Sequence, residues 1–161
     1  MKSFSVERGK PQGRYKLPEI FKGLTDSPAL VDLFKDETER TRILNETTVE
    51  ITASEDYMHV SDEDGRLIVG SRHLKKAREQ TLYLDIIHEL AHVKQFEKGV
   101  DLYDPKYAYI DRPTELEAYT LSVKEARRLG WSEREIADYL LVDWITKEQR
   151  DRLAQKLGVK I

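Results

Sequence analysis

The first half of the chain carries short apolar stretches whose spacing predicts strands. Residues 47–53 alternate apolar and polar side chains and are rich in β-branched residues, which is typical of a half-buried strand. Residues 57–60 and 67–69 are two further apolar runs, separated by the turn sequence Asp-Glu-Asp-Gly at 62–65. We interpret this acidic run as a hairpin turn rather than a calcium loop, because it lacks the ligand spacing and the terminal Glu of an EF-hand.

From about residue 74 onward, the apolar pattern takes the period of a helix. Residues 74–98 contain no Gly or Pro and are followed by Gly99, which is typical of a helix end. Ser132 and Thr146 are each followed three residues later by Glu or Gln, a capping-box pattern that starts a helix. Helices are therefore predicted for residues 28–35, 74–98, 113–130 and, in two parts, 132–158.

Strands that precede helices indicate an α+β fold. We expect a small, mostly antiparallel sheet followed by a helical layer that carries the two long helices. A chain of 161 residues is the size of one compact domain. Residues 1–20 contain two Gly and two Pro without a regular pattern, so we expect a flexible N-terminal arm there and a single domain over 21–161.

Composition and charge exclude several classes of protein. The 27 Lys and Arg are balanced by 30 Asp and Glu, and no basic stripe is present, which argues against nucleic-acid binding by bulk charge. The absence of Cys excludes disulfides, Cys-ligated zinc and thiol nucleophiles. Because we find neither a signal-peptide pattern nor a run of 18 apolar residues, we expect no membrane association and a cytoplasmic location.

Residues 88–92 read His-Glu-Leu-Ala-His, a pattern with a direct chemical use on a helix. Residues four apart lie one turn apart on the same face, so the imidazoles of His88 and His92 can bind one metal ion. Glu89 is then placed to act as a base toward metal-bound water. We expect one Zn²⁺ per chain, although His and carboxylate ligands also suit cobalt, manganese or iron.

A catalytic zinc site needs a third protein ligand, and no histidine follows His92. The extended HExxHxxGxxH pattern fails, because Gln95 and Lys98 stand where its glycine and third histidine would be. The remaining candidates are carboxylates: Asp101, Asp104, Asp111, Glu115 and Glu117. At about 100° per residue, Glu115 shares the apolar face of the second long helix, whereas Glu117 lies about 200° away among charged residues. A carboxylate within a buried stripe needs a partner, so we assign Glu115 as the ligand and Glu117 as a surface charge.

The segment from Asp85 to Leu121 resembles the gluzincins, which are zinc metallopeptidases that combine HExxH with a glutamate on a second helix. HELAHVKQ is followed, 23 residues after His92, by Glu-Leu-Glu-Ala-Tyr, with Glu115 three residues before a small residue as in that family. The short chain and the sheet before the motif look most like the minigluzincins. The ImmA/IrrE regulatory peptidases are similar around both helices, but that group usually has Asn at the position of Tyr119, and we recognise no helix-turn-helix module here.

This resemblance implies a peptidase that acts on a peptide or protein, with Glu89 as general base. It also implies that a strand beside the cleft binds extended substrate, and we assign Ile68, Val69 and Gly70 to that role. Tyr119, one turn after Glu115, is a candidate to orient a ligand histidine. Candidate donors to the substrate carbonyl are Tyr103, Tyr107, Tyr109 and Arg112, of which Tyr109 also enters the predicted substrate site.

Other features stay open at this level. His73 is interpreted as a surface residue because Lys75 and Lys76 stand beside it, and His59, which alternates with Tyr57 in a predicted strand, as a residue without a functional role. The apolar residues 139–144 can dock the C-terminal helices on the core, cover the cleft or mediate dimerisation, so the oligomeric state is not defined. The alternative to a peptidase is a zinc-dependent regulatory or binding protein with one specific partner or with latent activity.

Overall fold

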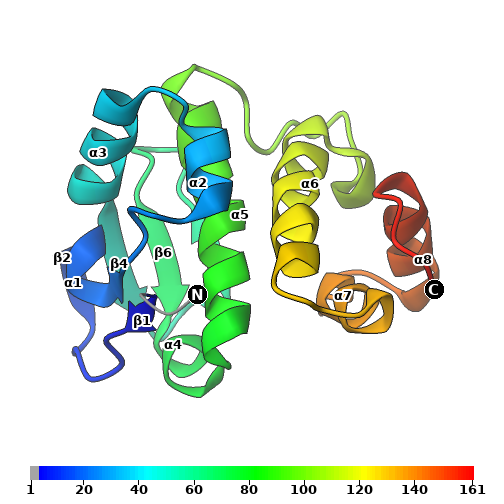
Figure 1. The fold of residues 1–161 in the computed structure, drawn as a ribbon, viewed down its shortest axis with the longest axis horizontal. Coiled ribbons are helices and arrows are strands. Elements are labelled where there is room, and N and C mark those ends of the chain that lie inside the picture. Colours follow the sequence, from blue (N-terminus) through cyan, green and yellow to red (C-terminus); the bar gives the residue numbers. More distant parts are fainter. Residues whose placement is uncertain (1–3) are drawn as a thin grey trace.

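The computed structural model describes residues 4–161, and the fold is α+β as predicted. Short strands and helices come first, and two long helices and two further helices follow them (Figure 1). In chain order the elements are β1 (Ser5–Val6), β2 (Gly13–Lys16), α1 (Leu17–Ile20), β3 (Phe21–Lys22), α2 (Pro28–Leu33), α3 (Glu37–Glu46), β4 (Thr48–Thr52), β5 (Met58–Val60), β6 (Leu67–Gly70), α4 (Ser71–Lys76), α5 (Glu79–Glu97), the 3₁₀ turn η1 (Tyr109–Asp111), α6 (Pro113–Arg128), α7 (Glu133–Leu140) and α8 (Lys147–Lys156).

The larger sheet is small and mostly antiparallel, as the sequence predicts. Its strand order is β2-β4-β6-β5, with β4 and β6 parallel and the other two pairs antiparallel. β5 and β6 form the expected hairpin. Gly65 in its turn has φ of +78°, and a Cβ there would lie 2.6 Å from the Phe96 ring of α5, so glycine allows the turn to pack on that helix.

Helix α5 is the centre of the molecule, because it packs against β5 on one side and α6 on the other. Figure 1 shows α6, α7 and α8 on the side of α5 that faces away from the sheet. A helix covered on both sides needs apolar residues around most of its circumference. The sequence supplies them, since the buried side chains of α5 include Leu82, Leu84, Ile86, Ile87, Leu90 and Val93.

The predicted helix over 74–98 is in fact two helices. α4 ends at Lys76, and Ala77 and Arg78 adopt extended backbone before α5 begins. The guanidinium of Arg8 donates hydrogen bonds to the carbonyls of Leu74, Lys75 and Ala77, at 2.8, 3.2 and 2.8 Å. These bonds satisfy carbonyls that the end of α4 leaves without intrahelical partners, so the N-terminal segment stabilises the break.

The prediction of a flexible arm over residues 1–20 is wrong for the part of it that the structure describes. Phe4, Leu17 and Ile20 are buried, and they belong to an apolar cluster that extends along the chain to Val159. The remaining residues of the predicted arm, 1–3, lie outside the described residues. The helix α3 was not predicted, because Ile43 and Leu44 are the only buried residues among its ten and give no apolar period.

The C-terminal helices dock on the rest of the protein. Both predicted capping boxes are present, at Ser132 with Glu135 and at Thr146 with Gln149. α8 packs against α7 and η1 and buries Leu153. No helix within residues 4–161 combines the length and the apolar composition that a membrane span requires.

Candidate metal centre

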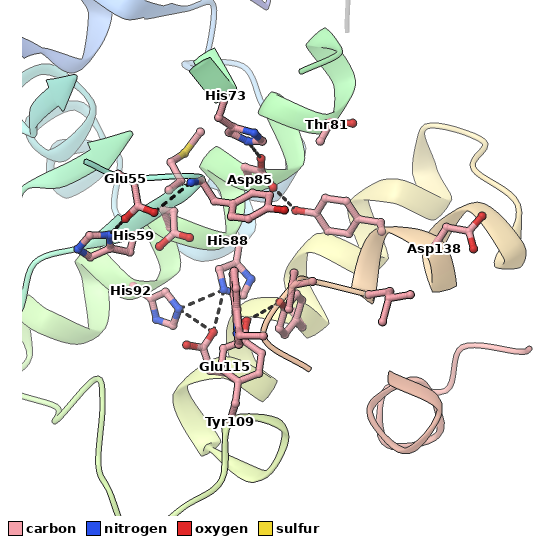
Figure 2. Close-up of a pocket in the computed structure, with 18 of the residues that line it drawn as sticks. Glu55, His59, His73, Thr81, Asp85, His88, His92, Tyr109, Glu115 and Asp138 are labelled. Carbon is pink, nitrogen blue, oxygen red and sulfur yellow. Dashed lines mark hydrogen bonds and ion pairs between the residues drawn. The ribbon is translucent and has the colours of Figure 1, made fainter. Parts of the chain in front are cut away.

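Two neighbouring helices bring His88, His92 and Glu115 together in the interior. The Nε2 atoms of His88 and His92 are 3.2 Å apart, and they lie 2.9 and 3.1 Å from Oε1 of Glu115 (Figure 2). A tetrahedral zinc ion with bonds of about 2.0–2.1 Å separates its ligand atoms by about 3.3 Å. The three atoms are therefore close to the spacing that one ion requires, and this buried group can hold a metal ion.

The local sequence explains why these side chains meet. His88 and His92 are four residues apart on α5, and Glu115 lies in the first turn of α6, which begins at Pro113. The Glu115 side chain is buried, with 4% of the residue exposed, whereas Glu117 is exposed on the same helix. The two glutamates thus have the burial that the helix-face argument expects, and the assignment of Glu115 as the ligand stays a prediction.

The charges within the group compensate one another. Burial alone would raise the pKa of Glu115, but the hydrogen bonds from His88 and His92 outweigh burial and hold that pKa below its usual range. Burial lowers the pKa of His92, yet the hydrogen bonds to Glu115 and Gln95 and the nearby charges of Glu89 and Glu115 together raise it to about 9. Burial keeps the pKa of His88 below its usual value. A metal cation at this position would replace the shared proton.

Glu89 faces the same cavity as the three ligand candidates. Its residue is 7% exposed, and within residues 4–161 its carboxylate forms no hydrogen bond or ion pair. Burial raises the pKa of Glu89 well above its usual value. Because no side chain or backbone group within residues 4–161 engages it, the Glu89 side chain is free to contact a molecule bound in the cavity.

The cavity has a volume of about 750 Å³ and lies between the sheet side and the helical side of the molecule. Of the four predicted donors, Tyr103, Tyr109 and Arg112 line it, whereas Tyr107 is exposed and does not. Arg112 lies over the faces of the Tyr103 and Tyr109 rings, at 5.7 and 5.8 Å, and its buried Nε has no hydrogen-bond partner in the described chain. Its Nη1 lies 3.7 Å from Oε2 of Glu115, so the guanidinium stands beside a candidate ligand.

Tyr119 contacts a ligand candidate, although not through its hydroxyl. Its ring meets the His88 ring at an edge, with centroids 4.3 Å apart, while its Oη hydrogen-bonds Tyr109 Oη at 2.6 Å. Packing against Tyr119 therefore restricts the orientation of the His88 ring. The predicted contact between Tyr119 and a ligand histidine is present as ring packing.

The prediction that Ile68, Val69 and Gly70 bind substrate by strand addition is wrong. They belong to β6, which is paired with β4 on one side and β5 on the other, and none of them lines the cavity. Gly70 instead allows close packing, since a Cβ there would lie 2.1 Å from the carbonyl oxygen of Glu55. The sheet edge beside the cavity belongs to β5, whose Met58 and His59 line it.

A second polar cluster lines the cavity one turn before His88, and sequence reasoning missed it. His73 Nε2 lies 2.7 Å from Oδ2 of Asp85, and the Tyr139 hydroxyl donates to Oδ1 of Asp85 at 2.6 Å (Figure 2). The interpretation of His73 as a surface residue is therefore wrong. The available signal was the position of Asp85, three residues before His88 on one helix face. His59, by contrast, is half exposed and pairs with Glu55, and the interpretation that it has no functional role stays a prediction.

Trp144, in the connection between α7 and α8, contacts both walls of the cavity. Its ring meets Tyr57 and Tyr109 edge-on, with centroids 5.6 Å apart in each case, and 51% of the residue stays exposed. Leu141 and Val142 of the same connection also line the cavity. The apolar residues 139–144 thus combine two of the roles left open by the sequence, since they dock α7 and border the cavity.

Comparison with known proteins gives no relative for this chain. No protein-family model, no curated protein and no solved structure matches it. The likeness to gluzincins therefore stays a prediction made from the motif residues, and the site has to be interpreted from its own geometry.

Proposed function

We propose that this protein is a zinc-dependent peptidase of the gluzincin type. The observation that supports this proposal is the buried group of His88, His92 and Glu115 with the unengaged carboxylate of Glu89 in the same cavity. Three protein ligands and an adjacent base are the arrangement of a catalytic zinc site, whereas a structural site uses four protein ligands. When bound, zinc would polarise the carbonyl group of the substrate and lower the pKa of a water molecule.

Glu89 is the group that moves protons in this proposal. Its carboxylate takes a proton from the attacking water, whose oxygen forms the new bond to the carbonyl carbon of the substrate. Glu89 then delivers that proton to the amide nitrogen as the C–N bond breaks, so the products are a carboxylic acid and an amine, which become a carboxylate and an ammonium group when the acid's proton passes to the amine. Burial raises the pKa of Glu89, which makes its carboxylate a stronger base toward water.

Arg112 and Tyr109 are the donors proposed for the substrate carbonyl oxygen, which gains negative charge during attack. Arg112 is held over two tyrosine rings with an unpartnered Nε, and Tyr109 lines the same wall. Donors fixed in place before the reaction stabilise such charge better than mobile water does.

An extended peptide is the substrate that this cavity suits. The free edge of β5 offers backbone groups to a further strand, and Met58 and His59 on that strand line the cavity. A peptide bound there would lie across the face of α5 that carries His88 and Glu89. This placement replaces β6 as the proposed substrate strand.

The position of Trp144 favours a second candidate function, a regulatory protein that cleaves one specific partner or none. Trp144 touches both walls of the cavity, so a bulky or folded chain must displace it to reach Glu89. A general peptidase should cut unstructured proteins of many sequences, whereas a regulator should leave them intact.

The test of the proposal is hydrolysis of an unstructured protein such as casein by the zinc-loaded chain. We expect cleavage that disappears when a chelator removes the metal and returns when zinc is added back. Cleavage that persists without metal would point to a contaminating enzyme or another mechanism. Absence of cleavage by fully loaded protein would favour the regulatory candidate.

A further inference from the structure

Gln95 contacts both helices that supply the metal-binding group. It lies three residues after His92 on α5 and is buried, with 5% of the residue exposed. Its Oε1 is 2.7 Å from Nδ1 of His92, and its Nε2 donates to the carbonyl of Thr114 at 3.1 Å and to Oε1 of Glu117 at 2.9 Å. Both hydrogens of the amide nitrogen and the amide oxygen are therefore engaged.

These contacts determine which way the amide points. A backbone carbonyl such as that of Thr114 can only accept a hydrogen bond, so the atom that faces it must be the amide nitrogen. The amide oxygen then faces His92, and Nδ1 of His92 must carry the hydrogen that it accepts. With Nδ1 carrying this hydrogen, Nε2 of His92, which faces His88 and Glu115, is the nitrogen that can bind a metal once the proton that it shares with Glu115 has left.

The amide nitrogen of Gln95 donates its hydrogen bonds to the beginning of α6. Thr114 and Glu117 flank Glu115 in the first turn of that helix, and the Thr114 hydroxyl is itself fixed by a bond to the carbonyl of Leu102. One side chain thus connects the last turns of α5 to the turn that carries the carboxylate ligand. His88 has no comparable support, since its buried Nδ1 has no hydrogen-bond partner among the described residues.

We propose that Gln95 is a positioning residue that prepares the site for metal by fixing the tautomer of His92 and the distance between His92 and Glu115. This inference rests on the proposed metal binding at His88, His92 and Glu115. Outer partners of this kind typically change metal affinity by about 10–100-fold when removed. Glu117, two residues from Glu115, serves only as an acceptor for the Gln95 amide.

The experiment compares zinc affinities of the full chain by competition with a chromophoric chelator. Gln95→Leu should bind zinc about 10–100-fold more weakly than wild type. In this variant Nδ1 of His92 loses its hydrogen-bond acceptor, and the Thr114 carbonyl and the Glu117 carboxylate of α6 lose the N–H groups that donate to them. Glu117→Gln should stay close to wild type, since a glutamine oxygen can still accept from Gln95. Gln155→Leu, an exposed glutamine on α8, is the matched control and should not change the affinity.

The stability of the metal-free variants toward denaturant separates a positioning role of Gln95 from a structural one. Weaker zinc binding by Gln95→Leu without a loss of stability supports positioning. Unchanged zinc affinity in Gln95→Leu, whether or not its metal-free form unfolds earlier, would overturn the inference alone. A wild type that binds no zinc would overturn the metal assignment together with it.

If Gln95→Leu does not fold, the wild type still provides a test. A nitrogen-15 NMR spectrum of the zinc-loaded protein should show His92 with hydrogen on Nδ1. Hydrogen on Nε2 of His92 would contradict the proposal.

Discussion

Replacing Glu89 by Gln should abolish hydrolysis while zinc stays bound at one ion per chain. Glutamine keeps the size and the hydrogen-bonding capacity of the side chain but cannot accept the proton from water at neutral pH. Loss of a general base typically costs about 10²–10⁴-fold in rate, so we expect a fall in kcat of at least about 100-fold. Initial rates on a peptide substrate, measured with elemental analysis of the same samples, test this prediction.

Glu79→Gln is the matched control for this change, because Glu79 is an exposed glutamate in the first turn of the same helix. It should retain both metal and activity. Full activity in Glu89→Gln would end the peptidase assignment. Loss of metal together with activity would instead show that Glu89 supports the site rather than the chemistry.

Replacing Glu115 by Ala should remove most of the bound metal, whereas Glu117→Ala should retain it. Glu115 supplies one of the three ligand atoms, and without it the two buried imidazoles face each other with no negative partner. The affinity should fall by more than the about 10–100-fold expected for an outer partner. Zinc content after dialysis, measured by elemental analysis, distinguishes the two variants.

Glu117→Ala removes a carboxylate two residues from Glu115 but leaves the hydrogen bonds of Gln95 to His92 and Thr114 in place. It is therefore the control for loss of a nearby carboxylate. If this variant loses the metal and Glu115→Ala does not, the ligand assignment is wrong. Circular dichroism of both metal-free proteins shows whether either change disturbs α6 itself.

Sequence periodicity was sufficient to identify the three ligand candidates. The HExxH spacing needs only the geometry of a helix, and Glu115 stands out because the apolar face of α6 includes it and excludes Glu117. Capping boxes at Ser132 and Thr146 located the two C-terminal helices for the same reason, since their interactions involve residues three apart. Patterns that involve residues three or four apart were therefore sufficient to predict these helices and the face on which Glu115 lies.

Features that depend on distant residues were not predictable in this way. The break between α4 and α5 is stabilised by Arg8, which is 66 residues from its first acceptor, Leu74. The choice of β5 rather than β6 as the edge beside the cavity depends on strand order, and alternation in a strand does not reveal its neighbours. Gln95 was considered only as a departure from an extended motif, because its partners Thr114 and Glu117 lie on another helix.

The most direct test of the account is a crystal structure of the zinc-loaded protein with anomalous diffraction data collected at the zinc edge. The account predicts one strong anomalous peak within about 2.0–2.2 Å of Nε2 of His88, Nε2 of His92 and a carboxylate oxygen of Glu115. A fourth position should be open toward the cavity beside Glu89. No peak at this place in fully loaded protein, or a peak held by other residues, would contradict the assignment of the site.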